Sequence, residues 1–418
     1  MAYQCDEVAA LNSPAFGSER VPAGTLSALS TSETANLGIR RWCKAPILHH
    51  KATEEARLAR WAGKYECCVL QISRSSKWQI FQLGVCMSNT VKIVRFHKTG
   101  PAEVLQFDEL PLPEPGPKEV RLRVKALGLN RAEIMFRNGQ YLETPVPPSK
   151  NGYEAAGIID AVGPGVDAGW IGKTVSTVPG TFKLNDHGVY GEVAVVPFHG
   201  VAEYPSTLSY EQGASIWMQY LTAYGALIWL GKITNGDFVV ITAASSSVGI
   251  AAIEMVKVEG AISIGVTRTA AKKAELFKQG ADHVIVTDEE DLVARVNEIT
   301  SGKGARIVFD PIGGKILESL AAATAPKGII FEYGALAAEP TPYPLFTALA
   351  KYLTIRGYTL FELTPDPVFP KAKQYIFEHL ASGAFKPLID RTFPFAEIVD
   401  AHWYMESNAQ IGKIVLVL

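Results

Sequence analysis

Between residues 237 and 358 the chain alternates apolar runs with helical patterns, and this alternation constrains the fold more than any other feature. The runs predict six buried strands, at 237–244, 261–268, 283–287, 305–312, 327–333 and 353–358. Helical patterns separate the first five of these strands, at 247–258, 270–279, 290–300 and 314–323. Strands that alternate with helices in this way form a doubly wound parallel sheet, so the predicted fold class is α/β. A ligand of such a sheet is expected at the carboxyl ends of its strands.

The turn between the first of these strands and its helix is a candidate phosphate site. It reads ASSSVG at 244–249, whereas a dinucleotide-binding turn normally carries Gly at its first, third and sixth places. Only Gly249 remains, but Ala and Ser are small enough for a pyrophosphate to approach the backbone. The positive end of the following helix would hold the anion. The expected contacts are Ser245, Ser246, Ser247, Val248 and Gly249; the alternative is that the serines only cap the helix.

The end of the second strand indicates which dinucleotide binds. An NAD site places Asp or Glu about 20 residues after the glycine turn, where the carboxylate binds the ribose hydroxyls. No carboxylate occurs from 260 to 274; Thr267, Arg268 and Lys272 are found there instead. Cations pair with a 2′-phosphate, so NADPH is the expected cofactor. The alternative is that Arg268 and the lysines only form a solvated face.

The chain before residue 211 has a different pattern, with short strands between Gly- and Pro-rich turns. Strands are expected at 91–96, 120–126, 157–162, 174–178 and 191–196, and LPLPEPGP at 110–117 reads as an extended connector. These features predict a compact β-rich domain at 87–210. Residues 360–418, which end in a strand at 413–418, are expected to complete it. Residues 211–359 then form the cofactor-binding domain.

This order of motifs resembles the medium-chain dehydrogenase/reductase superfamily, and specifically its zinc-free branch of quinone oxidoreductases and 2-enoyl-thioester reductases. The resemblance covers residues 87–418. It rests on LNRAE at 129–133, RNGQY at 137–141, GYEAAG at 152–157, LTAY at 221–224, DPIGG at 310–314 and GKIV at 412–415. It implies a GroES-like catalytic domain and a Rossmann cofactor-binding domain.

The resemblance also implies site residues. Where the zinc enzymes of the superfamily have Cys, His and Cys ligands, this chain has Asn130, Tyr153 and Met218, which do not make a zinc site. Tyr141 is expected to give the substrate a proton or hydrogen bond, with Asn130 and Tyr153 facing the same cavity. Gly334 and Lys413 are expected to contact the cofactor.

The expected function is hydride transfer from NADPH to an α,β-unsaturated carbonyl, an enone or a quinone, with a dedicated step in secondary metabolism as one setting. Two alternatives stay open. One is a metal-independent alcohol/ketone dehydrogenase, and the other is a non-enzymatic protein of the lens-crystallin or adaptor kind.

The first 86 residues differ from the rest and are expected to be a poorly ordered extension, with one helix at 51–61. The alternatives are a start of translation at Met87 and a transit peptide, for which the frequent Ser and Arg residues argue and the early acidic residues argue against. All five cysteines lie there, so the remaining chain has no disulfide or thiolate metal site. A formal net charge of −2 and the lack of long apolar runs argue against nucleic acid and membrane as partners. A cytoplasmic homodimer that acts on a small molecule is expected.

Overall fold

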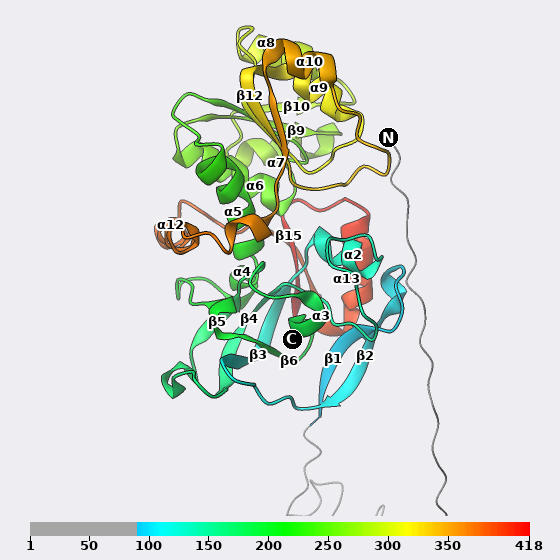
Figure 1. The fold of residues 1–418 in the computed structure, drawn as a ribbon, viewed down its shortest axis with the longest axis vertical. Helices are drawn as coiled ribbons and strands as arrows, with labels where there is room; N and C mark the ends of the chain where they lie inside the picture. The colour runs from blue at the N-terminus through cyan, green and yellow to red at the C-terminus, as the bar shows by residue number, and fades with distance from the viewer. Residues whose placement is uncertain (1–89) are drawn as a thin grey trace, which may run out of the picture. The chain divides into compact units, whose positions relative to one another are not determined.

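The computed structural model describes residues 90–418, and a six-stranded parallel sheet forms the centre of one of its two lobes (Figure 1). The strand order is β10-β9-β8-β11-β12-β13, with every neighbouring pair parallel. The strands are β8 (Phe238–Ile241), β9 (Ile262–Thr267), β10 (His283–Val286), β11 (Ala305–Asp310), β12 (Thr324–Glu332) and β13 (Thr354–Gly357). The order reverses between β8 and β11, so the doubly wound α/β prediction is confirmed.

Helices cover both faces of this sheet. They are α6 (Ser247–Val258), α7 (Lys273–Lys278), α8 (Leu292–Ile299), α9 (Ile316–Ala323) and α10 (Leu345–Lys351). Val240 and Val308 belong to a buried cluster with residues of α8 and α9, whereas their neighbours Val239 and Phe309 belong to a cluster with residues of α6. Because both faces are buried, the strands read as continuous apolar runs rather than alternating ones.

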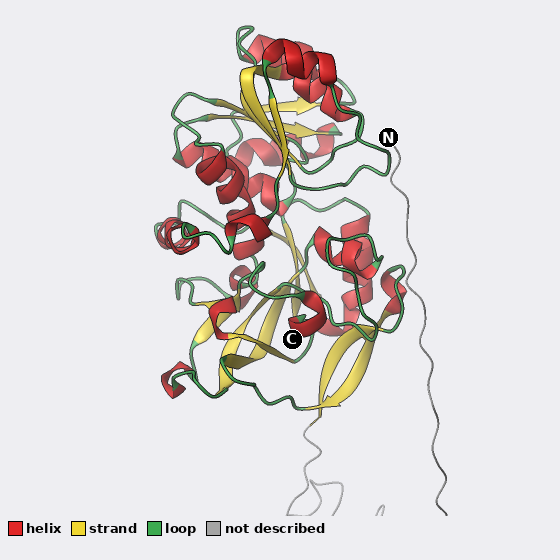
Figure 2. Ribbon diagram, in the orientation of Figure 1, coloured by secondary structure: helices red, strands yellow, loops and turns green. Residues whose placement is uncertain are grey.

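The second lobe is rich in β-structure, and Figure 2 shows its strands in yellow, apart from the parallel sheet. β1 (Thr90–Phe96) and β2 (Leu105–Pro111) form an antiparallel pair. A seven-stranded sheet has the order β14-β15-β3-β4-β5-β7, with β6 paired to β3. Its strands are β3 (Glu119–Gly128), β4 (Glu154–Val162), β5 (Thr174–Thr177), β6 (Val193–Pro197), β7 (Val201–Ala202), β14 (Ile389–Pro394) and β15 (Lys413–Val417).

The C-terminal segment returns to the β-rich lobe, because β14 and β15 belong to its sheet. Further helices flank the two sheets: α2 (Arg131–Arg137), α3 (Leu184–His187), α4 (Tyr210–Gly213), α5 (Trp217–Tyr224), α11 (Leu360–Leu363), α12 (Phe369–Ala381) and α13 (Ile398–Glu406). Just before β15, the Gly412 N–H donates to the Ser245 carbonyl at 2.9 Å. This bond joins the end of the chain to the turn after β8.

One segment of the fold differs from the expectations, and one expected helix lies outside the described residues. The segment at 110–117 is not a connector throughout, because β2 runs to Pro111 and pairs with β1. The helix expected at 51–61 lies outside the described residues. No helix within residues 90–418 has the length and apolar character that a membrane crossing requires.

Candidate active site

A cavity of about 1380 Å³ lies where the carboxyl ends of the parallel strands meet the β-rich lobe. Its lining includes the turn after β8, the ends of β9 and β12, the start of α2 and the loop before β15. Pockets for a single small molecule usually measure about 300–1,000 Å³. This cavity is larger, so it has room for an extended ligand and a second molecule beside it.

The serine turn after β8 forms one wall of the cavity. Ser245, Ser246, Ser247 and Val248 line it, as expected. The Ser246 hydroxyl accepts from the Gly249 N–H at 3.0 Å, so this serine also caps α6. Gly249 does not line the cavity: a Cβ atom there would lie 2.6 Å from the Ala244 carbonyl oxygen, and its role is to let α6 pack closely on β8.

The end of β9 supplies the positive charge at one end of the cavity. Thr267, Arg268 and Lys272 line it. Arg268 forms no side-chain hydrogen bond or ion pair with any residue between 90 and 418 that the structure describes, so its guanidinium is available to an anion. The Lys272 ammonium already donates to the Ser245 hydroxyl at 3.2 Å and to the Asn408 and Gln410 carbonyls at 2.8 and 2.9 Å. A phosphate contact by Lys272 would require one of these bonds to be exchanged.

Aromatic rings line another part of the cavity, where the β-rich lobe forms the wall. The Tyr153 ring centre lies 6.5 Å from that of Tyr141 and 6.4 Å from that of Phe361. Tyr153 has no exposed surface, and its hydroxyl has no hydrogen-bond partner among residues 90–418. Burial raises the pKa of Tyr141 to about 12 and that of Tyr153 further above its usual value, so both hydroxyls keep their protons near neutral pH.

Buried polar groups hold this aromatic wall in place. Tyr153 directly precedes β4, and Glu133 fixes its backbone. The Glu133 carboxylate accepts from the Tyr153 N–H at 2.8 Å and from the Asn130 N–H at 2.7 Å. Lys413 and Glu154 form an ion pair in which each side chain is 1% exposed. The Lys413 ammonium also donates to Asn130 Oδ1 at 2.6 Å.

These bonds change the interpretation of two expected site residues. Asn130 lines the cavity, but its amide nitrogen donates to Gly128 O and to Glu133 Oε1. Lys413 lies behind the cavity wall rather than in it, paired with Glu154 and not with a ligand. Cofactor contact by Lys413 therefore stays a prediction, whereas its contact with Asn130 indicates a supporting role.

The comparisons with known proteins agree with this arrangement. A family described as zinc-binding dehydrogenase matches residues 279–416, and the alcohol dehydrogenase GroES-like domain matches residues 116–206. Quinone oxidoreductase 1 of Escherichia coli is 32% identical over 332 residues, which cover 78% of this chain and 98% of that protein. The chain belongs to the medium-chain dehydrogenase/reductase superfamily, in its quinone oxidoreductase-like branch.

One solved structure and one further relative are also similar to this chain. The crystal structure of Escherichia coli quinone oxidoreductase complexed with NADPH superimposes with a TM-score of 0.72 at 31% identity, and covers 78% of this chain and 100% of that one. The synaptic vesicle membrane protein VAT-1 homolog of Rattus norvegicus is 30% identical over 322 residues, covering 73% of this chain and 78% of that protein. The GroES-like match confirms the expected nature of the β-rich lobe.

Although one matching family is described as zinc-binding, the residues of this reductase-like chain do not offer zinc ligands. Asn130, Tyr153 and Met218 all line the cavity, so the structure brings the three positions together. Their amide, phenol and thioether groups are poor zinc donors. Between residues 90 and 418, no three His, Cys, Asp or Glu side chains are grouped so that they could hold a metal.

We therefore expect purified protein to contain no stoichiometric zinc. Elemental analysis by plasma mass spectrometry measures this directly. One zinc per chain, lost to a chelator together with the activity, would contradict the expectation.

The cavity lining also contains residues that the sequence motifs do not indicate. Gly334 lines the cavity as expected, but so do its neighbours Glu332 and Tyr333. They end or directly follow the buried strand β12, so the rule that ligands bind at carboxyl ends of strands would have identified them. Gln410 and Phe361 lie on loop and helix segments far along the chain, and no local pattern indicates their place.

Proposed function

We propose that this protein is an NADPH-dependent reductase that adds a hydride to a quinone, an enone or another α,β-unsaturated carbonyl without using a metal ion. The Tyr153 hydroxyl carries the proposal, because it is buried, has no partner among the described residues and lies in the cavity wall. A buried polar group without a partner costs about 1–3 kcal/mol. A substrate carbonyl oxygen beside Tyr153 would satisfy this donor.

The sheet order supports the way NADPH would lie in the cavity. Arg268 follows β9, the serine turn follows β8, and Glu332 ends β12 on the other side. The 2′-phosphate would meet Arg268 and the pyrophosphate would meet the start of α6. The nicotinamide half would then reach β11 and β12, near the aromatic wall. When bound there, NADPH supplies the hydride.

The two tyrosines account for the rest of the chemistry. The Tyr153 O–H donates to the substrate carbonyl oxygen, and this bond strengthens as negative charge develops on that oxygen. The hydride adds to the electrophilic carbon, and Tyr141 or a water molecule gives the proton that completes the reduction. Tyr141 then regains a proton from solvent. Since both tyrosines are protonated near neutral pH, both are ready to donate.

The proposal is tested by following NADPH oxidation with one quinone, one enone and one aldehyde. We expect turnover with the quinone or the enone. Turnover with the aldehyde alone would favour the alcohol/ketone dehydrogenase, and no turnover despite NADPH binding would favour a non-enzymatic role.

The preference for NADPH over NADH is expected to depend on Arg268. The carboxylates in the cavity lining, Glu332 and Glu362, lie on β12 and α11, so none ends β9. A charge-assisted hydrogen bond is worth about 1.5–3 kcal/mol, so Arg268→Ala should weaken NADPH binding about tenfold or more. NADH binding should barely change.

Equilibrium titration with both nucleotides checks this preference. Arg295→Ala is the matched control, since Arg295 lies on α8, away from the cavity, and pairs with Glu290 and Glu298. If the unmodified protein binds NADH as tightly as NADPH, the assigned role of Arg268 is wrong.

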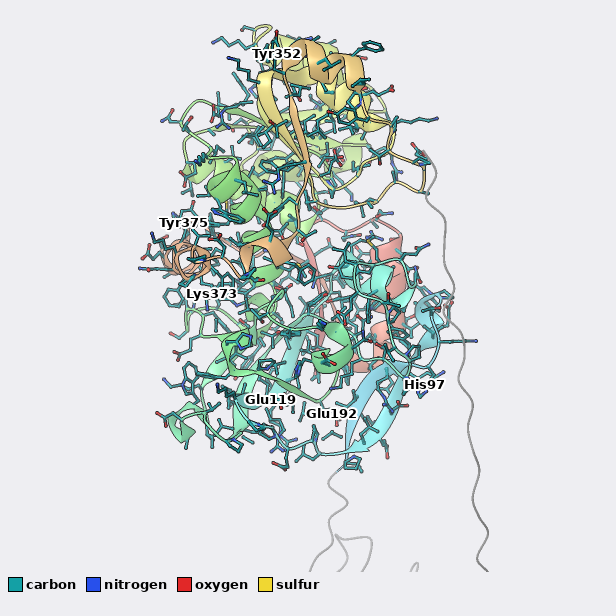
Figure 3. The ribbon with its side chains drawn as sticks, viewed as in Figure 1. His97, Glu119, Glu192, Tyr352, Lys373 and Tyr375 are labelled. Carbon is teal, nitrogen blue, oxygen red and sulfur yellow. The ribbon has the colours of Figure 1, made fainter. Side chains whose placement is uncertain are left out.

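We also propose that the protein is a homodimer that forms through the β13 edge of the parallel sheet. β13 ends the strand order, so one side of its backbone is free to pair with another strand. The neighbouring α10 region exposes large apolar side chains: Tyr343, Leu345, Phe346, Leu349 and Tyr352, the last labelled in Figure 3. Light scattering of the unmodified protein and of Phe346→Glu tests the proposed dimer, since a monomer in both samples would exclude it.

We also propose a cytoplasmic location for the protein.

A further inference from the structure

Two carboxyl groups lie side by side at the carboxyl edge of the parallel sheet. Asp310 ends β11 and Glu332 ends β12, and the two residues are partners in the strand register. Residues paired in a parallel register point to the same face of a sheet. The two carboxyl groups are therefore direct neighbours.

The two groups have different partners. Asp310 is fully buried and accepts hydrogen bonds from the Thr242 hydroxyl and from the Gly313 N–H. Glu332 lines the cavity, and its Oε1 is buried without a partner among the described residues. Both oxygens of Asp310 are thus engaged within the protein, whereas Glu332 has an oxygen available for a ligand.

The surroundings keep Glu332 protonated at neutral pH. Burial and the negative charge of Asp310 raise the pKa of Glu332 to about 8. Two adjacent carboxylates in a buried place repel each other, so one of them retains its proton. The retained proton lies in a side-chain hydrogen bond from Glu332 to Asp310, so the unpartnered Oε1 of Glu332 is left as an acceptor.

The position of Glu332 identifies what its free oxygen meets. On the next strand, its register partner is Gly357, where a Cβ atom would have no neighbour within 4 Å, so there is open space beside Glu332. Counting along the sheet edge from Arg268 and the serine turn, Glu332 lies on the far side of the turn. A dinucleotide that spans this edge brings its nicotinamide riboside half to Glu332.

We propose that Glu332 is a positioning residue whose unpartnered Oε1 accepts a hydrogen bond from a hydroxyl group or the carboxamide N–H of the nicotinamide riboside. The inference rests on the proposed binding of NADPH. It adds a specific consequence: ionisation of Glu332 removes the proton shared with Asp310, and the repulsion between the two carboxylates moves Oε1 out of its position for the ligand. Affinity for the nicotinamide half of the cofactor then falls as the pH rises.

Other ionisable groups on the elements around Glu332 are Lys315, Tyr333, Glu339, Arg356, Tyr358 and Glu362. Arg356 and Glu362 form an ion pair at 2.8 Å, which balances their charges. Asp310 is the charged group that acts on the pKa of Glu332. Burial also lowers the pKa of Lys272, at the other end of the cavity, so the experiment must separate the effects of the two groups.

The test compares two ligands at pH 7 and pH 9. One is NADPH, and the other is adenosine 2′,5′-bisphosphate, which lacks the nicotinamide riboside but would still contact Arg268 and Lys272. The measured quantity is the dissociation constant of NADPH divided by that of the fragment. Because the protonated fraction of a group with a pKa near 8 falls about tenfold over this range, the ratio should rise about tenfold in the unmodified protein.

Glu332→Gln stays neutral at every pH, with an N–H that can donate to Asp310 and an oxygen that can accept from the ligand, so its ratio should be low and constant. Glu339→Gln, a change at an exposed carboxylate in the loop after β12, should behave like the unmodified protein. A constant ratio in the unmodified protein, or the same rise in Glu332→Gln, would overturn the role of Glu332 and leave NADPH binding intact. If the unmodified protein binds the fragment and NADPH at neither pH, the proposed function itself is wrong.

Discussion

Replacing Tyr153 with Phe is expected to lower kcat about 10²–10³-fold, the usual effect of removing one donor to a developing oxyanion. The Tyr153 hydroxyl is buried in the cavity wall without a partner, so the substrate oxygen is the group that it would serve. The Phe ring would still fill the space between Tyr141 and Phe361. Folding and NADPH affinity should therefore change little, and steady-state kinetics with a quinone or an enone measures the loss.

Tyr204→Phe is the matched control for this change. The Tyr204 hydroxyl is also buried without a partner among the described residues, but Tyr204 does not line the cavity. We expect kcat of Tyr204→Phe to equal that of the unmodified protein. If Tyr153→Phe keeps full turnover, Tyr153 is not the donor, and the oxygen would have to be served by Tyr141 alone.

Replacing Lys413 with Met is expected to destabilise the protein by about 3–5 kcal/mol, because it leaves Glu154 buried without its partner. Both side chains of this pair are 1% exposed, so water cannot replace the lost contact. The change also removes the bond to Asn130 Oδ1. Denaturant unfolding, followed by circular dichroism, measures the difference in free energy.

Lys173→Met provides the comparison. Lys173 and Glu203 form an ion pair at 3.3 Å, but their side chains are 52% and 50% exposed. Exposed pairs contribute about 0–1 kcal/mol, so this variant should unfold almost like the unmodified protein. Equal effects of the two changes would show that Lys413 has no special structural role. A Lys413→Met protein of normal stability that has lost NADPH affinity would restore Lys413 to the cofactor site.

The parallel sheet could be predicted from the sequence because its strands are buried on both faces. Such strands form continuous apolar runs, and the helix expected at 247–258 is α6, which runs from Ser247 to Val258. The β-rich lobe was harder to delimit. β2 ends in the Pro-rich stretch at 110–117, where Pro111 can take an edge position of a strand.

The site was predictable where a local pattern marks it. The serine turn, Arg268 and the tyrosines lie in the cavity at places that turn chemistry or family motifs indicate. Contacts between residues that lie far apart in the sequence are not indicated by any local pattern. Lys413 reaches Glu154 from 259 residues away, and Glu332 reaches Asp310 through the strand register. These contacts exist only once the sheets are assembled, which is why the sequence alone led to a ligand role for Lys413.

The most direct test of metal-free conjugate reduction by NADPH is a deuterium-transfer experiment. The protein is incubated with NADPH that carries deuterium at the transferable C4 position and with an enone, and the product is analysed by mass spectrometry and NMR. We predict one deuterium atom on the β-carbon of the saturated ketone, formed at full rate in the presence of a chelator. Deuterium on the carbonyl carbon, or no deuterium in any product, would contradict the proposed reaction.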